Sequence, residues 1–378
     1  MGRVNAESAM KTIRWTFFAA SVALLAACAS APKPDLASKA PIRHVFVIVL
    51  ENEPFEVTFH ENSIAPYLAH ELPRQGALLT NYYAIGHLSL DNYIAMISGQ
   101  APNKATQDDC KTYVDFVRTR PGLDENGQAS GEGCVYPPDV KTLPDQLEAA
   151  GFTWKGYMED MGLDPAREAH TCAHPPLGAK DITNKATPRD QYGAKHNPFV
   201  YFHSIIDDQA RCDAHVVNLD ALEGDLTNIA TTPNYAFITP NLCHDGHDAP
   251  CKNGEPGGLI SADKFLREWE PKILAAPAFK RDGLLVVTFD EGTANDACCG
   301  EQPLPGGPPP GRFGPGGGRT GAVLFSPWIK PGTVSTQEYN HYSLLRSIED
   351  LFGLAHLGYA AAPQLLSFGE DVYTASKR

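Results

Sequence analysis

Two apolar segments that end in the same kind of residue constrain the fold of this chain most strongly. Both are rich in β-branched and aromatic residues, which is typical of strands buried on both faces of a parallel sheet. Each is followed at once by oxygen-bearing side chains: Glu51 and Asn52 after residues 44–50, and Asp290 and Glu291 after residues 284–289. Ligands of open α/β sheets bind at the carboxyl ends of the strands. We therefore expect these four side chains to meet at one edge of a sheet.

The chemistry of these four residues predicts a site for a hard cation. Carboxylates and amide carbonyls are the ligands that Mg²⁺, Ca²⁺ and Mn²⁺ prefer. Acidic residues also occur where a strand simply ends and a loop begins. Two such pairs on two segments of the same kind favour the functional interpretation over this ordinary one.

The rest of the chain alternates strand-like and helix-like patterns, which predicts an α/β fold. Strands are expected at residues 44–50, 77–85, 152–159, 234–240, 282–291 and 321–329, and helices at 64–76, 93–99, 143–151, 261–277 and 341–354. Residues 103–138 are expected to form a long cross-linked loop, and the polar residues 165–215 an insertion over the sheet. The Gly- and Pro-rich residues 303–318 cannot hold regular structure and suit either a lid or an inert surface loop.

The charge balance excludes nucleic acid as a partner. The formal net charge is −14, and no cluster of Lys and Arg is present to neutralise a phosphate backbone. Hydrophobic residues make up 43% of the chain, which is enough for a large core. If a protein this acidic acted on an anionic substrate such as a phosphate ester, it would need a bound cation to offset the repulsion.

The N-terminus has the features of an export signal. From Met10, a short basic region precedes an apolar stretch at residues 15–27, which is too short to span a bilayer. The stretch ends in Leu-Ala-Ala-Cys and resembles the bacterial lipobox, whose cysteine is lipidated; an ordinary cleaved signal or a chance apolar N-terminus are the alternatives. We expect a lipoprotein-type signal at residues 1–28, a flexible tether at 29–42 and a single domain at 43–378. The protein would then be exported to the bacterial periplasm or outer membrane and anchored in the membrane by lipid at Cys28.

The cysteines beyond Cys28 predict disulfide bonds. They are even in number, which in an exported chain is typical of a disulfide framework. Proximity in the sequence favours the pairs Cys110 with Cys134, Cys172 with Cys212, and Cys243 with Cys251. The adjacent Cys298 and Cys299 then remain, and they either form a vicinal bridge or show that this pairing is wrong. The cysteine spacing does not match a zinc ribbon.

Ser89 lies where a predicted strand gives way to a helix. Its hydroxyl is well placed to cap the helix, which is the ordinary role of such a serine. The same place favours a bound phosphate, because backbone N–H groups and the helix dipole point at it. A serine hydroxyl becomes a nucleophile when a base or a metal activates it. Asn92 lies one turn further along and can direct its amide toward the same phosphate.

Seven stretches of the sequence together resemble a known enzyme family. They are VFVIVLENEPF, HLSLDNYIAMISG, FTWKGYMEDM, KHNPFVYF, FITPNLCHDGHD, VVTFDEG and YNHYSLLRSIEDLFGL, and they run from about residue 44 to residue 354. In this order they are similar to the phosphoesterase family of the alkaline phosphatase superfamily, which contains bacterial acid phosphatases, phosphatidylinositol phosphatases and phospholipases C. The resemblance implies an alkaline-phosphatase-like three-layer α/β/α sandwich with a mostly parallel central sheet.

The resemblance also implies roles for individual residues. Ser89 corresponds to the family nucleophile, Asn92 to the asparagine that contacts phosphate, and the metal ligands to Glu51, Asn52, Asp290 and Glu291. Asp245, His247 and His341 fall where the superfamily builds a second metal site or a cluster that donates protons. Such a cluster could bind zinc or protonate the leaving group. His87, Lys195 and His196 are further candidates for contacts to the phosphate or the leaving group.

The chain departs from the family pattern near the nucleophile. Leu88 and Asp91 stand where family members commonly have proline, so the start of the helix is expected to differ. His244 stands where a smaller polar residue is expected, which leaves open whether His244 or His247 faces the site.

The function expected from the sequence is metal-dependent hydrolysis of phosphate monoesters through a phosphoserine intermediate. The divalent ion would be Mg²⁺, Ca²⁺, Mn²⁺ or Zn²⁺, and the substrate a small phosphate ester or a phospholipid headgroup. One alternative is a phosphodiesterase of the phospholipase C type, which needs the same nucleophile and a roomier pocket. A second alternative is a surface binding protein that keeps the fold without catalysis, which the intact set of Ser89 and its four proposed ligands disfavours.

Overall fold

The computed structural model of the chain describes residues 1–2, 40–374 and 376–377. Most of the expected signal, Cys28 and residues 29–39 of the expected tether lie outside the described residues. Among the helices in the described part of the chain, none combines the length and the apolar character that crossing a membrane requires.

An eight-stranded sheet lies at the centre of the fold. Its strands follow the order β11-β2-β10-β9-β1-β8-β6-β7. Their bounds are β1 (His44–Leu50), β2 (Ala77–Leu79), β6 (Trp154–Met158), β7 (Val216–Asn218), β8 (Tyr235–Thr239), β9 (Gly283–Phe289), β10 (Ala322–Phe325) and β11 (Thr333–Ser335). β10 pairs antiparallel with β9 and β2, and the other described pairings of this sheet are parallel. The mostly parallel sheet expected from the sequence is confirmed.

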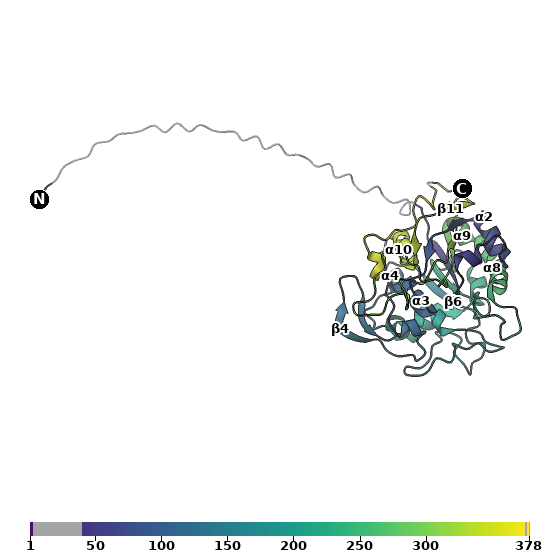
Figure 1. Ribbon diagram of the computed structural model, residues 1–378, viewed down its shortest axis with the longest axis horizontal. Coiled ribbons are helices and arrows are strands. Elements are labelled where there is room, and N and C mark those ends of the chain that lie inside the picture. Colours follow the sequence, from purple (N-terminus) through teal and green to yellow (C-terminus); the bar gives the residue numbers. More distant parts are fainter. Residues whose placement is uncertain (3–39, 375, 378) are drawn as a thin grey trace, which may run out of the picture. The chain divides into compact units, whose positions relative to one another are not determined.

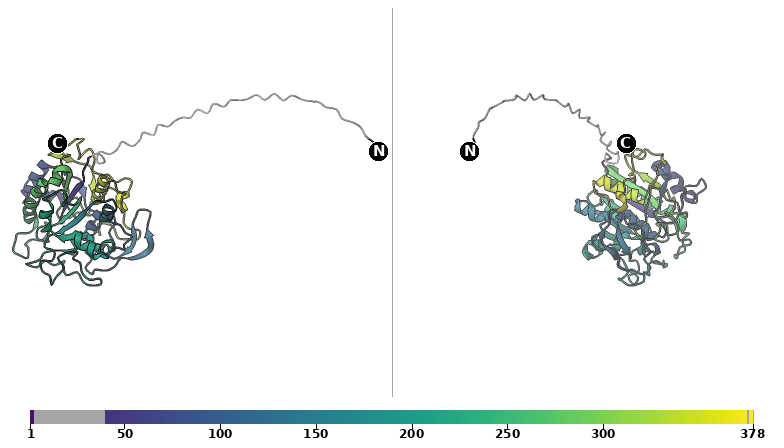
Figure 2. Two further views of the ribbon diagram at one scale, coloured as in Figure 1. Left: turned by 180° about the vertical axis from the view of Figure 1, so that it is seen from behind. Right: turned by 60° about the vertical axis from the view of Figure 1, so that its left-hand side comes forward.

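Helices cover both faces of this sheet (Figures 1 and 2). On one face, the odd-numbered valines of β1 share a core with α3 (Ser89–Ser98), α4 (Leu143–Ala149) and α10 (His341–Phe352). On the other, Phe46, Ile48 and Leu50 share a core with α8 (Gly258–Ala275), α9 (Pro277–Asp282) and the π-helix η2 (Tyr67–Glu71). Because successive strand residues point to opposite faces, a fully apolar strand such as β1 supplies both cores. The three-layer α/β/α arrangement is therefore confirmed.

Shorter helices connect these elements. They are α1 (Phe55–Thr58), α2 (Leu72–Gln75), η3 (Thr106–Asp108), η4 (Ala194–His196), η5 (Pro198–Tyr201), α5 (His203–Ile206), α6 (Gln209–His215), α7 (Ala221–Asp225) and η6 (Gly358–Ala361). Residues 303–318 contain no helix or strand, as expected. The three predicted disulfides are present, and Cys298 and Cys299 form the vicinal bridge that the sequence left as one of two alternatives.

Two expectations about secondary structure were wrong. Residues 77–85 do not form one strand, because a turn at residues 80–81 separates β2 from β3 (Tyr82–Tyr83), which pairs with β12 (Tyr339–Asn340) in a separate sheet. Residues 103–138 are not a loop throughout, because β4 (Val117–Leu123) and β5 (Ala129–Glu132) form a hairpin. β4 is largely exposed and buries no continuous face, so its sequence lacks the alternation that marks a strand.

Candidate active site

The carboxyl ends of β1 and β9 bring three of the predicted ligands together. The two strands pair in parallel with Leu50 opposite Phe289, so Glu51 and Asp290 leave the sheet side by side. The backbone N–H of Asn52 donates to Asp290 Oδ1 at 3.0 Å, and the Asn52 amide donates to Glu51 Oε2 at 3.1 Å. These contacts hold the buried Glu51 and Asp290 and the half-buried Asn52 as one group at the edge of the sheet.

Ser89 is the first residue of α3 and faces this group. Its Oγ donates to Glu51 Oε2 at 2.7 Å, and the side chain is buried. The expected helix cap is absent, because Leu88 occupies the N-cap position and no side-chain cap bond forms. Leu88 has a φ of 71°, which proline cannot adopt, and its N–H donates to Glu291 Oε2 at 3.2 Å. The start of α3 thus presents the Ser89 hydroxyl to Glu51.

Asn92 is buried one turn after Ser89 on α3 and holds the loop that precedes Ser89. Its Oδ1 accepts from the backbone N–H groups of Ile85 and Gly86 at 2.9 and 3.0 Å. Its amide nitrogen donates to the carbonyls of Gly86 and Leu88 at 3.0 and 3.2 Å. The resemblance assigned Asn92 to a contact with phosphate, but in this structure its amide is fully hydrogen-bonded to backbone groups. Asn92 therefore positions the loop that precedes Ser89.

Lys195 adds a cation to the site from the 165–215 segment. Its Nζ donates to Ser89 Oγ at 3.3 Å and lies 3.5 Å from Asp109 Oδ2. Burial alone would lower the pKa of Lys195, but Asp109 and Glu51 outweigh it and raise that pKa. Lys195 is therefore charged at neutral pH and stands directly beside the hydroxyl.

His196, the neighbour of Lys195, contacts the other oxygen of Glu51. Its Nε2 lies 3.1 Å from Glu51 Oε1, and its Nδ1 lies 3.8 Å from Asp245 Oδ2. The ring stacks on Tyr93 of α3 with centroids 5.2 Å apart. The sequence offered Lys195 and His196 as further candidates, and the KHNPFVYF stretch was the one signal that pointed to them.

The carboxylates and cations of the site shift one another's pKa values. Burial raises the pKa of Asp290, and the neighbouring Glu51 and Glu291 raise it further. Burial alone would raise the pKa of Glu51, but His196 and Lys195 hold it below its ordinary value. The site therefore concentrates more negative charge than its own cations balance.

This charge and the free oxygens fit a bound cation. Asp290 Oδ2 is buried and has no hydrogen-bond partner among the described residues, and Glu51 Oε1 and Asp245 Oδ2 are buried with only the His196 ring beside them, at 3.1 and 3.8 Å. An unpaired buried carboxylate oxygen is costly unless it is paired or coordinates a metal. Two other clusters, around Cys243 and around Cys298, are not suited to a metal because their cysteines form disulfides.

Asp245 and Glu291 complete the acidic group. The backbone carbonyl of Asp245, which follows β8, accepts from the N–H of Glu51 at 2.7 Å. Glu291 forms a close ion pair with His87. Burial would lower the pKa of His87, but its hydrogen bond to Glu291 outweighs this and raises the pKa. Glu291 thus follows Asp290 directly, and Asp245, which the resemblance assigned to a second cluster, lies beside Glu51.

The predicted histidines lie in different surroundings. His341, at the start of α10, is fully buried, donates from Nε2 to the Asp290 carbonyl at 2.5 Å and accepts from the Tyr82 hydroxyl at 3.0 Å. Burial lowers the pKa of His341 to about 4. The His247 side chain is 52% exposed, and within the described residues its ring pairs only with Asp248, at 3.7 Å.

His244 is also directed away from Glu51. Its Nδ1 lies 2.8 Å from Glu159 Oε1, and its Nε2 lies 3.5 Å from Glu255. Burial would lower the pKa of His244, but the hydrogen bond to Glu159 outweighs it and raises that pKa to about 9. His196 therefore occupies the position beside Glu51 that the sequence left open between His244 and His247.

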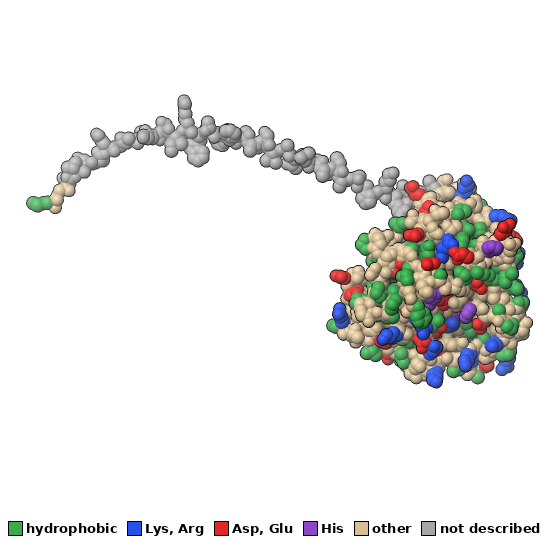
Figure 3. Space-filling view, in the orientation of Figure 1, with side chains coloured by type: hydrophobic (Ala, Val, Ile, Leu, Met, Phe, Trp, Pro, Cys, Tyr) green, Lys and Arg blue, Asp and Glu red, His purple; other side chains and the backbone are tan. Residues whose placement is uncertain are grey.

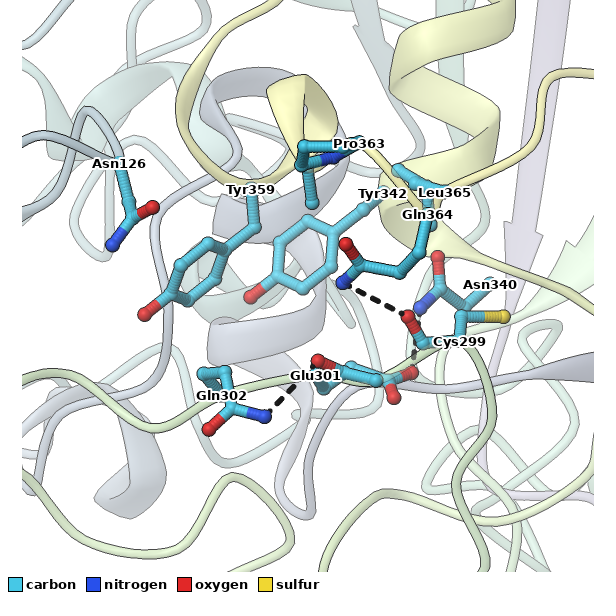
Figure 4. Close-up of a pocket in the computed structure, with 12 residues that line it drawn as sticks. Asn126, Cys299, Glu301, Gln302, Asn340, Tyr342, Tyr359, Pro363, Gln364 and Leu365 are labelled. Carbon is cyan, nitrogen blue, oxygen red and sulfur yellow. Dashed lines mark hydrogen bonds between the residues drawn. The ribbon is translucent and has the colours of Figure 1, made fainter.

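Two cavities lie near these residues. A cavity of about 700 Å³ is lined by Lys195 and Asp109 and reaches the surroundings of Ser89. A smaller cavity of about 220 Å³, shown in Figure 4, is lined by Tyr342, Tyr359 and residues around Cys299. Neither lining includes Ser89, but the larger cavity includes Lys195, whose Nζ contacts the Ser89 hydroxyl.

Comparisons with known proteins identify the family of this chain. The probable acid phosphatase of Kluyveromyces lactis is 27% identical over 326 residues, and the alignment covers 84% of this chain and 60% of that protein. The phosphatidylinositol-3-phosphatase of Mycobacterium tuberculosis is 24% identical over 343 residues, 90% of this chain and 88% of that protein. A solved protein of the alkaline phosphatase superfamily from Vibrio parahaemolyticus has 12% identity and a TM-score of 0.47, over 84% of this chain and 68% of that one. The model of the phosphoesterase family matches residues 57–355, and the chain therefore belongs to the phosphoesterase family.

Proposed function

We propose that this chain hydrolyses phosphate monoesters and that Ser89 is the nucleophile. The observation that carries the proposal is the position of the Ser89 hydroxyl, 2.7 Å from a Glu51 oxygen and 3.3 Å from the Lys195 ammonium at the start of α3. Two relatives that are named as phosphatases support the same chemistry. The chain spans 60% of the length of the Kluyveromyces lactis relative, so its activity is inferred here from its own site.

A divalent cation fits the acidic group. Glu51, Asn52, Asp290 and Glu291 would hold it, with Asp245 beside them, and the donor set suits Mg²⁺, Ca²⁺, Mn²⁺ or Zn²⁺. When bound, the ion would neutralise the phosphate and favour ionisation of the nearby hydroxyl.

The residues of the chain itself prepare the attack. Glu51 accepts the Ser89 hydrogen, so a lone pair of Oγ is free to face the substrate. The charged Lys195 stabilises the oxyanion as the proton leaves. The N–H groups at the start of α3 are available to the phosphate oxygens.

Two displacements then complete the reaction. In the first, Oγ releases its proton to solvent and bonds to phosphorus, the bond to the leaving oxygen breaks, and the alcohol departs with a proton from solvent. In the second, water attacks the phosphoserine, and phosphate leaves while Ser89 regains its hydrogen. His341 is neutral above about pH 5 and both its nitrogens are engaged, so its role is to hold Asp290.

The test compares Ser89→Ala with the wild type on p-nitrophenyl phosphate. Loss of a covalent nucleophile should lower kcat by roughly 10⁴- to 10⁶-fold with an unchanged circular dichroism spectrum. Ser98→Ala is the matched control, because Ser98 lies on the same helix and donates to the Ile94 carbonyl. Mass spectrometry of acid-quenched wild type should find phosphate on the Ser89 peptide. A folded Ser89→Ala protein with wild-type turnover would refute the proposal.

A further inference from the structure

The cavity beside Ser89 is lined by basic side chains in an acidic protein. Its volume is about 700 Å³, and its lining includes the four lysines Lys111, Lys180, Lys185 and Lys195. Lys195 lines the cavity and also donates to Ser89 Oγ, so this lysine connects the cavity to the nucleophile. A leaving group that extends from the reacting phosphate past Lys195 would enter this space.

Two of these lysines keep an uncompensated charge. Lys111 pairs with Asp108 at 2.5 Å, and Lys195 pairs with Asp109 at 3.5 Å. The ammonium groups of Lys180 and Lys185 make no hydrogen bond or ion pair with any residue in the described part of the chain. On the face of the molecule drawn in Figure 3, basic and acidic side chains are interspersed.

The acids at the cavity do not neutralise this pair. Asp109 is engaged by Lys195. Asp181 directs its Oδ1 at the backbone and hydroxyl of Thr183, each at 2.7 Å. Asp181 Oδ2 is buried without a hydrogen-bond partner among the described residues. The outer part of the cavity therefore offers two free cations, although the chain as a whole has a net charge of −14.

The backbone that carries Lys180 and Lys185 is held in place. Residues 179–181 pair with residues 111–113 through bonds from the Tyr113 N–H to the Ala179 carbonyl, 2.9 Å, and from the Asp181 N–H to the Lys111 carbonyl, 3.0 Å. Arg167 donates to the carbonyls of Thr183 and Lys185 at 2.8 and 3.2 Å. Charges on a fixed backbone bind an anion at a lower entropic cost than charges on a flexible loop.

We propose that Lys180 and Lys185 form a subsite for a second anionic group on the substrate. The substrate class is then a phosphate monoester whose leaving group carries another phosphate, as in a sugar bisphosphate or a phosphorylated inositol headgroup. Lysine is a common point-charge partner of phosphate, and a pair of lysines suits its two negative charges. This inference rests on the proposed function, because it assigns the leaving group of the same reaction.

The test measures phosphate release from fructose 1,6-bisphosphate and fructose 6-phosphate. For each protein we take the ratio of kcat/KM for the bisphosphate to kcat/KM for the monophosphate. Dividing the ratio of a variant by the ratio of the wild type cancels the intrinsic reactivity of the two esters. In Lys180→Ala/Lys185→Ala this ratio should fall about tenfold, as expected for lost bonds to a charged group. Lys185→Glu should lower it further. Lys330→Ala, which removes an exposed lysine that does not line this cavity, should leave it unchanged.

The outcomes separate the inference from the function beneath it. If the wild type hydrolyses both esters and the ratio is the same in the double variant, the subsite is refuted and the phosphatase proposal stands. If the wild type releases no phosphate from either fructose ester and none from p-nitrophenyl phosphate, both proposals fail.

A second arm distinguishes a free anion from a lipid headgroup. It compares a short-chain, water-soluble phosphatidylinositol phosphate with its long-chain form in phosphatidylcholine vesicles. An equal loss on both in the double variant supports recognition of the headgroup charge. A loss on vesicles alone, with the fructose ratio unchanged, would overturn the subsite in favour of a contact with the membrane surface.

Discussion

Glu349 on α10 should make the stability of this protein depend on pH in a direction opposite to that of most carboxylates. One of its oxygens accepts from the Leu357 N–H at 2.9 Å, and the other is buried without a hydrogen-bond partner among the described residues. Burial raises the pKa of Glu349 from 4.5 to about 9. The folded state therefore binds this proton more tightly than the unfolded chain does. Its stabilising contribution is complete below about pH 4.5 and is lost as the pH rises toward about 9.

The magnitude follows from this window. Each rise of one pH unit between the two pKa values lowers the free energy of unfolding by about 1.4 kcal/mol. Glu349 should therefore lower this free energy by about 3 kcal/mol between about pH 5 and about pH 7.5. Glu349→Gln keeps an acceptor for Leu357 and removes the ionisation. The difference in unfolding free energy between variant and wild type should therefore move by about 3 kcal/mol in favour of the variant over the same range.

Urea unfolding with the disulfides intact measures this difference at both pH values. Glu370→Gln is the control, because it removes the same charge from an exposed side chain and should change stability by less than about 0.5 kcal/mol. A Glu349→Gln effect of equal size at both pH values would refute the reasoning. The helix concerned begins at His341, so loss of its stability would also disturb the support of Asp290.

Three further predictions concern the site and the N-terminus. Asp290→Asn should lower the amount of bound metal and should also stabilise the chelated protein, because it removes a charge that Glu51 and Glu291 repel. Elemental analysis measures the first effect, and thermal unfolding in chelator measures the second. Full metal occupancy in the variant would show that Asp290 is misassigned as a ligand. His341→Ala should slow the hydrolysis of p-nitrophenyl phosphate and of phenyl phosphate by similar factors, because the buried ring only holds a backbone carbonyl. A much larger loss of activity on phenyl phosphate, whose leaving group needs a proton, would identify His341 as a proton donor. Cys28→Ser should move the enzyme from the membrane fraction to the soluble fraction with its activity intact, and sedimentation with membranes would contradict the lipid anchor.

Strong local patterns explain which parts of the fold could be predicted. β1 and β9 are apolar without interruption, and α10 has a clear amphipathic pattern that ends at Gly353 in the left-handed conformation. The exposed hairpin strand β4 carries a polar sequence with arginine and proline, so no periodic signal marks it. The short β2 and β3 were merged because their separation depends on a turn and on pairing with β12, a partner far away in the sequence.

The same limit applies to the site. Glu51 and Asp290 directly follow strands, so their meeting point could be read from the order of apolar and polar residues. Lys195 and His196 lie in a polar segment whose position depends on tertiary contacts, such as the stacking of His196 on Tyr93. The sequence correctly places Asn92 one turn after Ser89. It cannot show that the amide is already used by the backbone of the preceding loop.

The contacts that build the site join very distant parts of the chain. Asn52 and Asp290 are 238 residues apart, and Tyr82 and His341 are 259 residues apart. During synthesis, the nucleophile would emerge long before the strand that completes its surroundings, so no early fragment is expected to turn over substrate. Catalytic activity would therefore report directly on completed folding, and a simple chromogenic assay could follow refolding of this protein in real time.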